Sequence, residues 1–312
     1  MAHKVLIMDY GVGDVVMSTS LIRCMKKQYP EHKLIVACIY SDILRFNPNI
    51  DHLYQLGTLN DMYTAWVRPL KDSKDYIMLK PYEPRIQWFG NEPMSKLFCD
   101  LAGVEWDNDV LEFYLTKEEE KFGKDLLMCC TKPVIALQIE SARVSLRGGE
   151  KMITEKDWFN ENWDATVDAL KKDYDFVQVG GKDEYRVKNT KMCLLGKTNY
   201  RESAAVLKNC HTFITIDSAV SHIGPAVGKT GIVLFGRSKI STLGHKYNTN
   251  IEIKSTCPDQ PCLRPEPASG DLELRDGNNL ANWTCKDRVC MKIITPEIVI
   301  DAIKNFKPGK IE

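Results

Sequence analysis

Residues 4–38 read KVLIMDYGVGDVVMSTSLIRCMKKQYPEHKLIVAC. A short apolar run over 4–8 leads into a glycine turn, and apolar residues then recur at helical spacing over 15–29. Lysines and a proline close this pattern, which is typical of a helix end because cations favour the last turn and proline cannot continue it. A second apolar run over 33–38 completes a strand–helix–strand unit. Such a unit predicts a parallel sheet.

The same alternation begins again after Pro133. In the first half we expect a further strand over 75–79 and further helices over 93–102 and 117–130. In the second half we expect strands over 134–139, 175–179, 212–216 and 231–235, with helices over 160–172, 200–209 and 219–227 between them. Strands that alternate with helices in this way predict an α/β fold built on parallel sheets.

The chain has 312 residues, which is long enough for two domains. We expect two Rossmann-like, doubly wound domains that face each other across a cleft. The first covers 1–131, and the second covers 132–295 and includes a cysteine-containing loop region over 255–290. Residues 296–312 are expected to form a C-terminal helix that packs back on the first domain.

Lys and Arg together number 42, and Asp and Glu together number 42, so the chain carries no net charge. This balance argues against a protein held globally on nucleic acid or on an anionic membrane. No apolar stretch approaches the roughly 20 residues that span a bilayer, and no secretory leader is visible at the N-terminus. We therefore expect no transmembrane segment and a cytoplasmic location.

The first glycine turn carries a carboxylate. Residues 11–16 read GVGDVV, which is similar to a dinucleotide-binding fingerprint except that Val16 stands at the third glycine position. Asp14 falls at the start of the following helix, where it would repel a pyrophosphate. Two interpretations stand: Asp14 acts as a base on a neutral group, or it only benefits from the helix dipole.

A second turn, from Asp217 to His222, reads DSAVSH and follows a buried strand. Open α/β sheets bind ligands at this end of their strands. Asp217 or Ser218 is expected to cap the next helix and to leave backbone N–H groups for a diphosphate, with Ala219, Ser221 and His222 close by. The alternative is an ordinary helix cap with a buried, hydrogen-bonded histidine.

Other candidate donor-site residues are expected near the same sheet edge. Lys156 offers a cation ahead of a helix, and a Gly180-Gly181 turn with Glu184 follows one strand. Gly236 follows another strand in the sequence FGRS. Together with the turn at Asp217, these features favour a nucleotide-binding site.

Eleven cysteines fall into two groups. Four lie late in the chain with the spacing C-x4-C, 22 residues, C-x4-C, and such a set could hold a structural zinc or iron ion, or remain as thiols or disulfides. A catalytic metal is not expected there, because four thiolates leave no open position. The late group is Cys257, Cys262, Cys285 and Cys290. The other seven are expected to be small buried hydrophobic residues: Cys24, Cys38, Cys99, Cys129, Cys130, Cys193 and Cys210.

Several motifs, in the same order along nearly the whole chain, resemble glycosyltransferase family 9, the ADP-heptose lipopolysaccharide heptosyltransferase family. The resemblance rests on residues 4–7 with 13–16 and Thr19, on 47–51, on 156–158, on 180–184, and on 217–222 with 234–236. It implies the two-domain GT-B fold and a metal-independent transferase that inverts the anomeric carbon. The transferase that this resemblance implies needs no cofactor for catalysis.

The resemblance also implies residue roles. Asp14 matches the catalytic base, with Gly13 beside it on the acceptor side. Lys156 and the backbone of 218–221 would offset the charge of the leaving diphosphate, and His222 would contact the phosphates or the sugar. Ala219 departs from the family, which usually has glycine there.

The donor implied is a nucleotide-sugar, most simply an ADP-sugar, and the sugar is a heptose or a related one. The acceptor is a hydroxyl on a bacterial glycan, a protein or a modified nucleobase. Arg85 and Trp88, in an aromatic and basic loop, are the candidate acceptor-binding side chains, although a solvated loop explains them equally well.

Two other functions stay open at this point. A dinucleotide-dependent oxidoreductase would use the turn at 11–16 and an acidic residue after the second strand, for which Asp42 is a poor candidate. A non-catalytic protein that binds sugar nucleotides is the other alternative. The sequence does not fix the oligomeric state.

Overall fold

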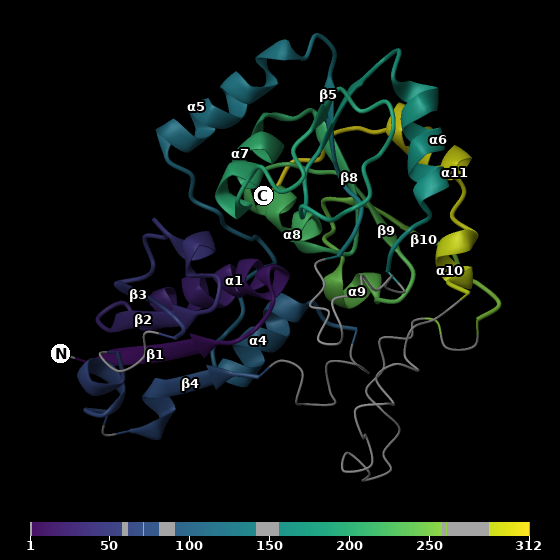
Figure 1. Cartoon of the computed structure of the whole chain (residues 1–312). Helices are drawn as coiled ribbons and strands as arrows, with labels where there is room; N and C mark the ends of the chain where they lie inside the picture. Colours follow the sequence, from purple (N-terminus) through teal and green to yellow (C-terminus); the bar gives the residue numbers. More distant parts are fainter. Residues whose placement is uncertain are drawn as a thin grey trace.

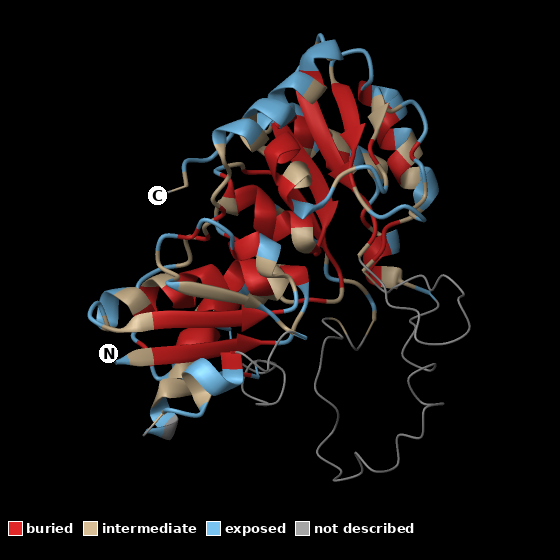
Figure 2. Ribbon diagram, turned by 60° about the vertical axis from the view of Figure 1, so that its left-hand side comes forward, coloured by how far each residue is buried: buried red, intermediate tan, exposed pale blue. Residues whose placement is uncertain are grey.

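A computed structural model of the chain describes residues 2–57, 62–70, 72–80, 91–141, 156–257, 260 and 287–311. It contains two parallel sheets, each flanked by helices, in two domains that lie one above the other in Figure 1. The strands of both sheets are largely buried, and the outward faces of the helices are exposed (Figure 2). The predicted α/β class with two Rossmann-like domains is confirmed.

The first domain holds a sheet of order β3-β2-β1-β4, in which every described pair of strands is parallel. The unit predicted from residues 4–38 forms its centre, because β1 pairs with β2 in register from His3 and Lys33 onward. The elements are β1 (His3–Met8), α1 (Val12–Gln28), β2 (Lys33–Cys38), η1 (Ser41–Leu44), β3 (His52–Gln55), η2 (Tyr63–Val67), η3 (Ser73–Asp75), β4 (Tyr76–Leu79) and α4 (Met94–Ala102).

The second domain holds a six-stranded parallel sheet of order β10-β9-β8-β5-β6-β7. Its predicted strands are all present, and two short edge strands, β7 and β10, were not predicted. β7 has only two residues and β10 is partly exposed, so neither carries an apolar run. The strands are β5 (Val134–Gln138), β6 (Asp175–Gln178), β7 (Met192–Cys193), β8 (Thr212–Ile216), β9 (Ile232–Phe235) and β10 (Thr249–Glu252). The helices are α6 (Asn160–Leu170), α7 (Tyr200–Asn209), α8 (Ala219–Ala226), α9 (Ile240–Leu243), α10 (Val289–Lys292) and α11 (Pro296–Lys304).

Helix α5 (Lys117–Leu126), followed by the short helix η4 (Leu127–Cys129), lies against the second domain, whereas the sequence placed it in the first. Its N-terminus has a capping box, in which Thr116 and Glu119 are bonded reciprocally. The helix packs along α7 so closely that a Cβ at Gly123 would come within 2.3 Å of the Ala205 carbonyl oxygen. Helical spacing predicts a helix, but it does not tell which domain the helix covers.

The C-terminal helix α11 packs on α6 and β9 of the second domain, so the predicted packing on the first domain is wrong. Val299 and Ile303 on α11 are buried in the same hydrophobic core as Trp163 of α6. Figure 1 shows the two helices side by side. The apolar stripe of α11 therefore covers part of the second domain's core beside α6.

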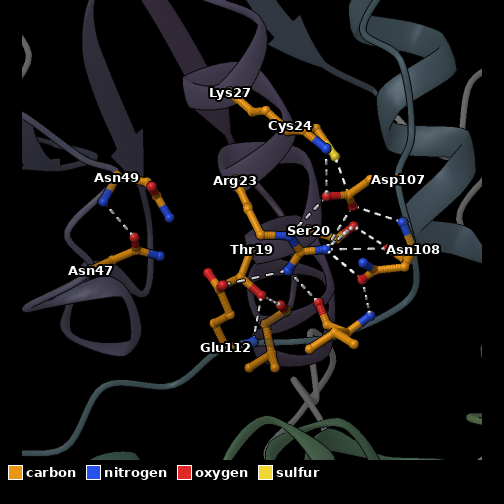
Figure 3. Close-up of polar contacts among 12 residues, drawn as sticks. Thr19, Ser20, Arg23, Cys24, Lys27, Asn47, Asn49, Asp107, Asn108 and Glu112 are labelled. Atoms are coloured by element: carbon orange, nitrogen blue, oxygen red, sulfur yellow. Dashed lines mark hydrogen bonds and ion pairs between the residues drawn. The ribbon is translucent and has the colours of Figure 1, made fainter. Parts of the chain in front are cut away.

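The segment that joins the two domains is held on α1 by Arg23 (Figure 3). The Arg23 guanidinium donates to the Val110 carbonyl at 2.7 Å, to the Asp107 carboxylate at 2.9 Å and to the Asn108 side-chain oxygen at 2.8 Å. Ser20 donates to the Asn108 carbonyl at 2.9 Å. These bonds fix the course of residues 107–110 between the domains.

The cysteine expectation is correct in part. Cys24, Cys38, Cys99 and Cys210 are buried, and burial raises the pKa of Cys38 and of Cys210 to about 12. Cys129 is exposed, and Cys130 and Cys193 are half-buried, because they lie at the end of η4 and on the edge strand β7. For these last three the prediction of burial is wrong.

Candidate active site

Helix α1 at the first glycine turn and helix α8, which follows Asp217 and Ser218, meet at their first turns. A Cβ at Gly13 of α1 would lie 2.8 Å from Cδ2 and 3.3 Å from Nε2 of His222 on α8. A side chain at position 13 would therefore collide with the imidazole, so only glycine lets the two helices approach this closely. The structure thus brings together the first turns of two helices from different domains. The sequence indicated each turn but not their contact.

Asp14 is the next residue on the first turn of α1 and is half-buried. The helix has no side-chain cap at Gly11, so the carboxylate at position 14 is the acidic group that meets the positive end of the helix dipole. Asp14 directly follows Gly13, which contacts His222 of the second domain. The residue next to the predicted catalytic carboxylate therefore contacts His222 of the predicted donor turn.

Asp217, directly after β8, is buried and paired with a cation. Lys156 Nζ lies 2.7 Å from Asp217 Oδ2, and Ser238 donates a further hydrogen bond to the same oxygen. Burial alone would raise the pKa of Asp217, but the charge of Lys156 and the hydrogen bonds from Lys156 and Ser238 hold it below its usual value. Asp217 is thus an anion that orients Lys156 toward the N-terminus of α8.

Neither Asp217 nor Ser218 caps α8, so the predicted helix cap is wrong. The Ser218 hydroxyl instead bonds to Gln138 Oε1 and to Thr215 Oγ1, and both partners lie at the ends of neighbouring strands. Ser221 turns its hydroxyl onto the Ser218 carbonyl at 2.6 Å. Because no side chain caps the helix, its first backbone N–H groups and its dipole are directed to the place where an anion would bind.

His222 is part of a hydrogen-bonded chain that sequence reasoning did not find. His222 Nδ1 lies 2.8 Å from His245 Nε2, and His245 Nδ1 lies 3.2 Å from Asp109 Oδ2. The other oxygen of Asp109 accepts a bond of 2.6 Å from Ser95. Burial, followed by the neighbouring His245, lowers the pKa of His222 to about 3. His222 is therefore neutral at physiological pH.

The Gly180-Gly181 turn lies at the same sheet edge, after β6. Gly180 has a φ of 149°, and a Cβ there would collide with Glu184. Glu184 Oε1 accepts a bond of 2.6 Å from the Gly181 N–H. The glycine pair is thus required by its own turn, and contact of Gly180, Gly181 and Glu184 with a ribose stays a prediction.

Gly236, after β9, faces the protein interior. A Cβ at this position would lie 2.6 Å from Met291 Sδ and 2.8 Å from Cys290 Sγ.

Trp158, two residues after Lys156, is also a core residue, and its indole donates to the Ile294 carbonyl at 2.7 Å. Glu140, shortly after β5, accepts a hydrogen bond from the Tyr185 N–H at 2.9 Å.

Some predicted site residues lie outside the described part of the chain: Arg85, Trp88, Cys262 and Cys285. Of the other late cysteines, Cys257 is half-buried and Cys290 is buried. Within the described ranges, no cluster of three or more His, Cys, Asp or Glu side chains is arranged to hold a metal ion. No described helix is long and apolar enough to cross a membrane.

Asp42, the acidic residue considered for a dinucleotide ribose, lies in η1 with a largely exposed side chain 3.7 Å from Arg45. Its carbonyl oxygen accepts a bond of 2.9 Å from Arg201 of the second domain. At this position it supports the contact between the domains rather than a ribose beside the turn at 11–16.

Comparison with known proteins supports a glycosyltransferase. The model of glycosyltransferase family 9 (heptosyltransferase) matches residues 93–270. The chain is 27% identical over 276 residues to lipopolysaccharide heptosyltransferase 3 of Escherichia coli, a match that covers 72% of this chain and 79% of that protein.

Solved structures share the fold at low sequence identity. A glycosyltransferase of family 9 from Veillonella parvula superimposes with a TM-score of 0.70 at 18% identity, over 97% of this chain and 96% of that one. The iron-containing dodecameric glycosyltransferase TibC of enterotoxigenic E. coli gives 0.66 at 14% identity, over 97% and 77%. The ADP-heptose lipopolysaccharide heptosyltransferase II of E. coli gives 0.60 at 14% identity, over 80% and 91%. The fold is GT-B, and the chain belongs to glycosyltransferase family 9, the heptosyltransferase family.

Proposed function

We propose that the protein transfers a heptose, or a related sugar, from a nucleoside-diphosphate donor to an acceptor hydroxyl, with inversion and without a catalytic metal. The observation that carries the proposal is the contact between Gly13 and His222. Gly13 directly precedes Asp14 in the chain, and His222 Nε2 lies 4.0 Å from Oδ1 of Asp217, which is paired with Lys156. A base and an anion-binding site on opposite domains are the two parts that such a transfer needs.

In the proposed reaction, Asp14 accepts the proton of the acceptor hydroxyl. The acceptor oxygen forms a bond to the anomeric carbon while the bond from that carbon to the diphosphate oxygen breaks. Attack from the face opposite the leaving group inverts the configuration. The proton stays on Asp14 until it is released to solvent, and the nucleoside diphosphate leaves with the electron pair.

Charge on the leaving diphosphate is offset by Lys156 and by the backbone N–H groups of α8. Lys156 Nζ lies 2.7 Å from Asp217 Oδ2, which fixes its position. Its side chain is still 23% exposed, so a ligand can reach it. The uncapped helix adds oriented dipoles that need no rearrangement during the reaction. In this proposal these groups replace the metal ion that other transferases use.

The donor we propose is ADP-heptose, since the relatives with this fold include a heptosyltransferase solved with ADP-D-beta-D-heptose and the ADP-heptose lipopolysaccharide heptosyltransferase II. Among the acceptors expected from the sequence, a bacterial glycan is favoured by the lipopolysaccharide heptosyltransferase 3 relative. A protein hydroxyl and a modified nucleobase are the other candidates. Arg85, Trp88 and a cytoplasmic location stay predictions.

The donor-binding role also extends to residues that the sequence selected and that line the same sheet edge. We assign Gly180, Gly181 and Glu184 to the nucleoside side of the donor. Ala219 and Ser221 would offer backbone N–H groups to the diphosphate. Gly236, although packed on Cys290 and Met291, has its peptide groups at the end of β9.

The four late cysteines form a donor set that suits a structural zinc or iron ion, since thiolates favour both metals. Cys257, Cys262, Cys285 and Cys290 would hold the ion and tie the region after β10 to the region before α11. Metal analysis of the purified protein tests this assignment. A metal content near zero, with all four thiols titratable, excludes it.

The test of the proposed function is mass spectrometry of donor turnover over a panel of ADP-, GDP- and UDP-sugars with glycan, peptide and nucleoside acceptors. We expect transfer from ADP-heptose, and an Asp14→Asn variant that binds the donor without transferring it. Tight ADP binding without transfer to any acceptor would instead indicate a non-catalytic binding protein. Binding of NADH with no nucleotide-sugar binding would favour the oxidoreductase.

A further inference from the structure

A chain of hydrogen bonds crosses the junction of the two domains and ends on His222. It runs from Ser95 on α4, through Asp109 in the connecting segment and His245 after α9, to His222 on α8. The side chains of Asp109, His245 and His222 are 13%, 3% and 4% exposed. Burying polar side chains at a domain junction costs free energy unless they are hydrogen-bonded, and here each member of the chain is bonded to the next.

Asp109, the second residue of this chain of hydrogen bonds, is held in place by the first domain. Ser95 donates to one oxygen of Asp109 at 2.6 Å, which leaves the other oxygen for His245. On either side of Asp109, the neighbouring residues Asn108 and Val110 are bonded to Arg23 of α1 (Figure 3). Asp109 is therefore a fixed acceptor, and its position is set by α1 and α4.

The positions of the protons follow from the partners. An ionised carboxylate only accepts hydrogen bonds, so His245 must carry its proton on Nδ1, toward Asp109. Taking the His245 ring as neutral, its Nε2 is then an acceptor, and the proton in the 2.8 Å contact is assigned to His222 Nδ1. His222 Nε2 is left with a lone pair.

We propose that Asp109 and His245 are positioning residues that hold His222 in the tautomer protonated on Nδ1, so that Nε2 accepts a hydrogen bond from a hydroxyl of the transferred sugar. This assignment rests on the proposed function for the identity of the ligand. It goes beyond that function because it separates two groups of the donor: the diphosphate goes to Lys156 and to α8, and a sugar hydroxyl goes to His222.

The surroundings of Nε2 support a hydroxyl ligand. The atom lies at the contact with Gly13, one residue from Asp14, and 4.0 Å from Asp217 Oδ1, too far for a hydrogen bond. A phosphate oxygen cannot donate to a lone pair, whereas a sugar hydroxyl can. The charged and titratable groups that act on the ring are His245, Asp217, Lys156 and Asp109, and the low pKa of His222, about 3, keeps the ring neutral.

The tautomer is tested first, on the protein without ligand. Two-bond proton–nitrogen correlation NMR distinguishes protonated from unprotonated ring nitrogens, and the signals of His222 and His245 are assigned by their loss in His222→Gln and His245→Gln. We expect a protonated Nδ1 and an unprotonated Nε2 on His222. A proton on Nε2 of His222 in the wild-type protein overturns the proposal.

Variants then test the relay. In His245→Leu, His222 loses the acceptor at Nδ1, so its ring proton is free to move to Nε2. In Asp109→Asn, the amide can donate a hydrogen bond to His245, which would reverse the tautomers of His245 and His222. We expect mixed tautomers in both variants. His245→Gln can accept from His222 and donate to Asp109, so it should restore the wild-type NMR pattern. Exposed His211, changed to Gln, is the matched control. An unchanged His222 pattern in His245→Leu and Asp109→Asn contradicts a positioning role.

The ligand is tested by comparing ADP with ADP-heptose in calorimetric titrations. For His245→Leu we expect ADP-heptose affinity to fall about five- to tenfold, the loss of one hydrogen bond, with ADP affinity within about twofold of wild type. Equal losses for both ligands overturn the assignment to a sugar hydroxyl. If the wild-type protein binds neither ligand, the proposed donor is wrong, while the NMR result on the tautomer stands independently.

Discussion

Gly13 of α1 and His222 of α8 are in direct contact across the two domains, so that a Cβ on residue 13 would come within 2.8 Å of the imidazole. This contact joins the first turn that carries Asp14 to the first turn that follows Asp217. The two halves of the candidate site are therefore adjacent. In the proposed function each half has one role, a base on α1 and an anion-binding helix end on α8.

The Gly13→Ala variant tests this contact. The added methyl group must push His222 or α1 away, and we expect the free energy of unfolding to fall by about 1–3 kcal/mol, the usual cost of overpacking. Transfer should fall as well, because Asp14 moves with α1. Thermal or chemical denaturation and initial rates measure both effects. Lys27→Ala, an exposed change on the same helix, is the control, and equal behaviour of the two variants would contradict the close contact.

The Asp14→Asn variant tests the base. The amide keeps the shape but cannot accept the acceptor proton, so we expect kcat to fall about 10²- to 10⁴-fold. Affinity for the donor should stay nearly constant, because Asp14 lies on the other domain. Steady-state rates and calorimetric donor binding separate the two effects. The exposed Asp9→Asn, five residues earlier in the sequence, is the control, and full activity in Asp14→Asn rules out this carboxylate as the base.

The Lys156–Asp217 pair predicts that the effect of changing one partner on the free energy of unfolding depends strongly on the other partner. Lys156→Met leaves the buried Asp217 carboxylate without its cation, and we expect a loss of about 2–4 kcal/mol in the free energy of unfolding, close to the cost of breaking a buried pair. The double variant Lys156→Met/Asp217→Asn should recover part of this loss, although not donor binding. Denaturation of the single and double variants measures the coupling, and additive effects would mean that the pair is not coupled.

The Arg23–Asp107 pair predicts a pH effect on stability. Burial would raise the pKa of Asp107, but the hydrogen bonds from Arg23 and Cys24 and the charge of Arg23 lower it from 3.8 to about 2. A lowered pKa in the folded state stabilises the protein above about pH 4, and this stabilisation is lost as the pH falls toward 2. The gain is about 1–2 kcal/mol, because solvent reaches the pair and screens it.

Asp107→Asn should therefore be less stable than wild type at pH 7, and the difference should shrink as the pH falls from 4 to 2. Chemical denaturation across this pH range gives the comparison. Asp125→Asn, in an exposed pair with Lys121 on α5, is the control and should change little at any pH. A constant difference between wild type and Asp107→Asn would show that Asp107 does not titrate with a lowered pKa.

The sequence by itself determined the two strand–helix alternations and the order of the motifs along the chain. Local apolar spacing is sufficient for this, because each strand and each amphipathic helix buries its own apolar face. Parallel strands also end at one edge of a sheet, so the residues after β6, β8 and β9, including Gly180, Asp217 and Gly236, could be assigned to that edge in advance.

Tertiary structure alone decided what depends on contacts between distant residues. It placed α5 and α11 on the second domain, turned the Ser218 hydroxyl away from α8, and brought Gly13 against His222. It also joined His245 to Asp109, which lies 136 residues away in the sequence. Single polar residues carry no periodic pattern, and the partner of each is chosen by how the two domains pack. For this reason the roles of Asp109 and His245 could be inferred only from the folded protein.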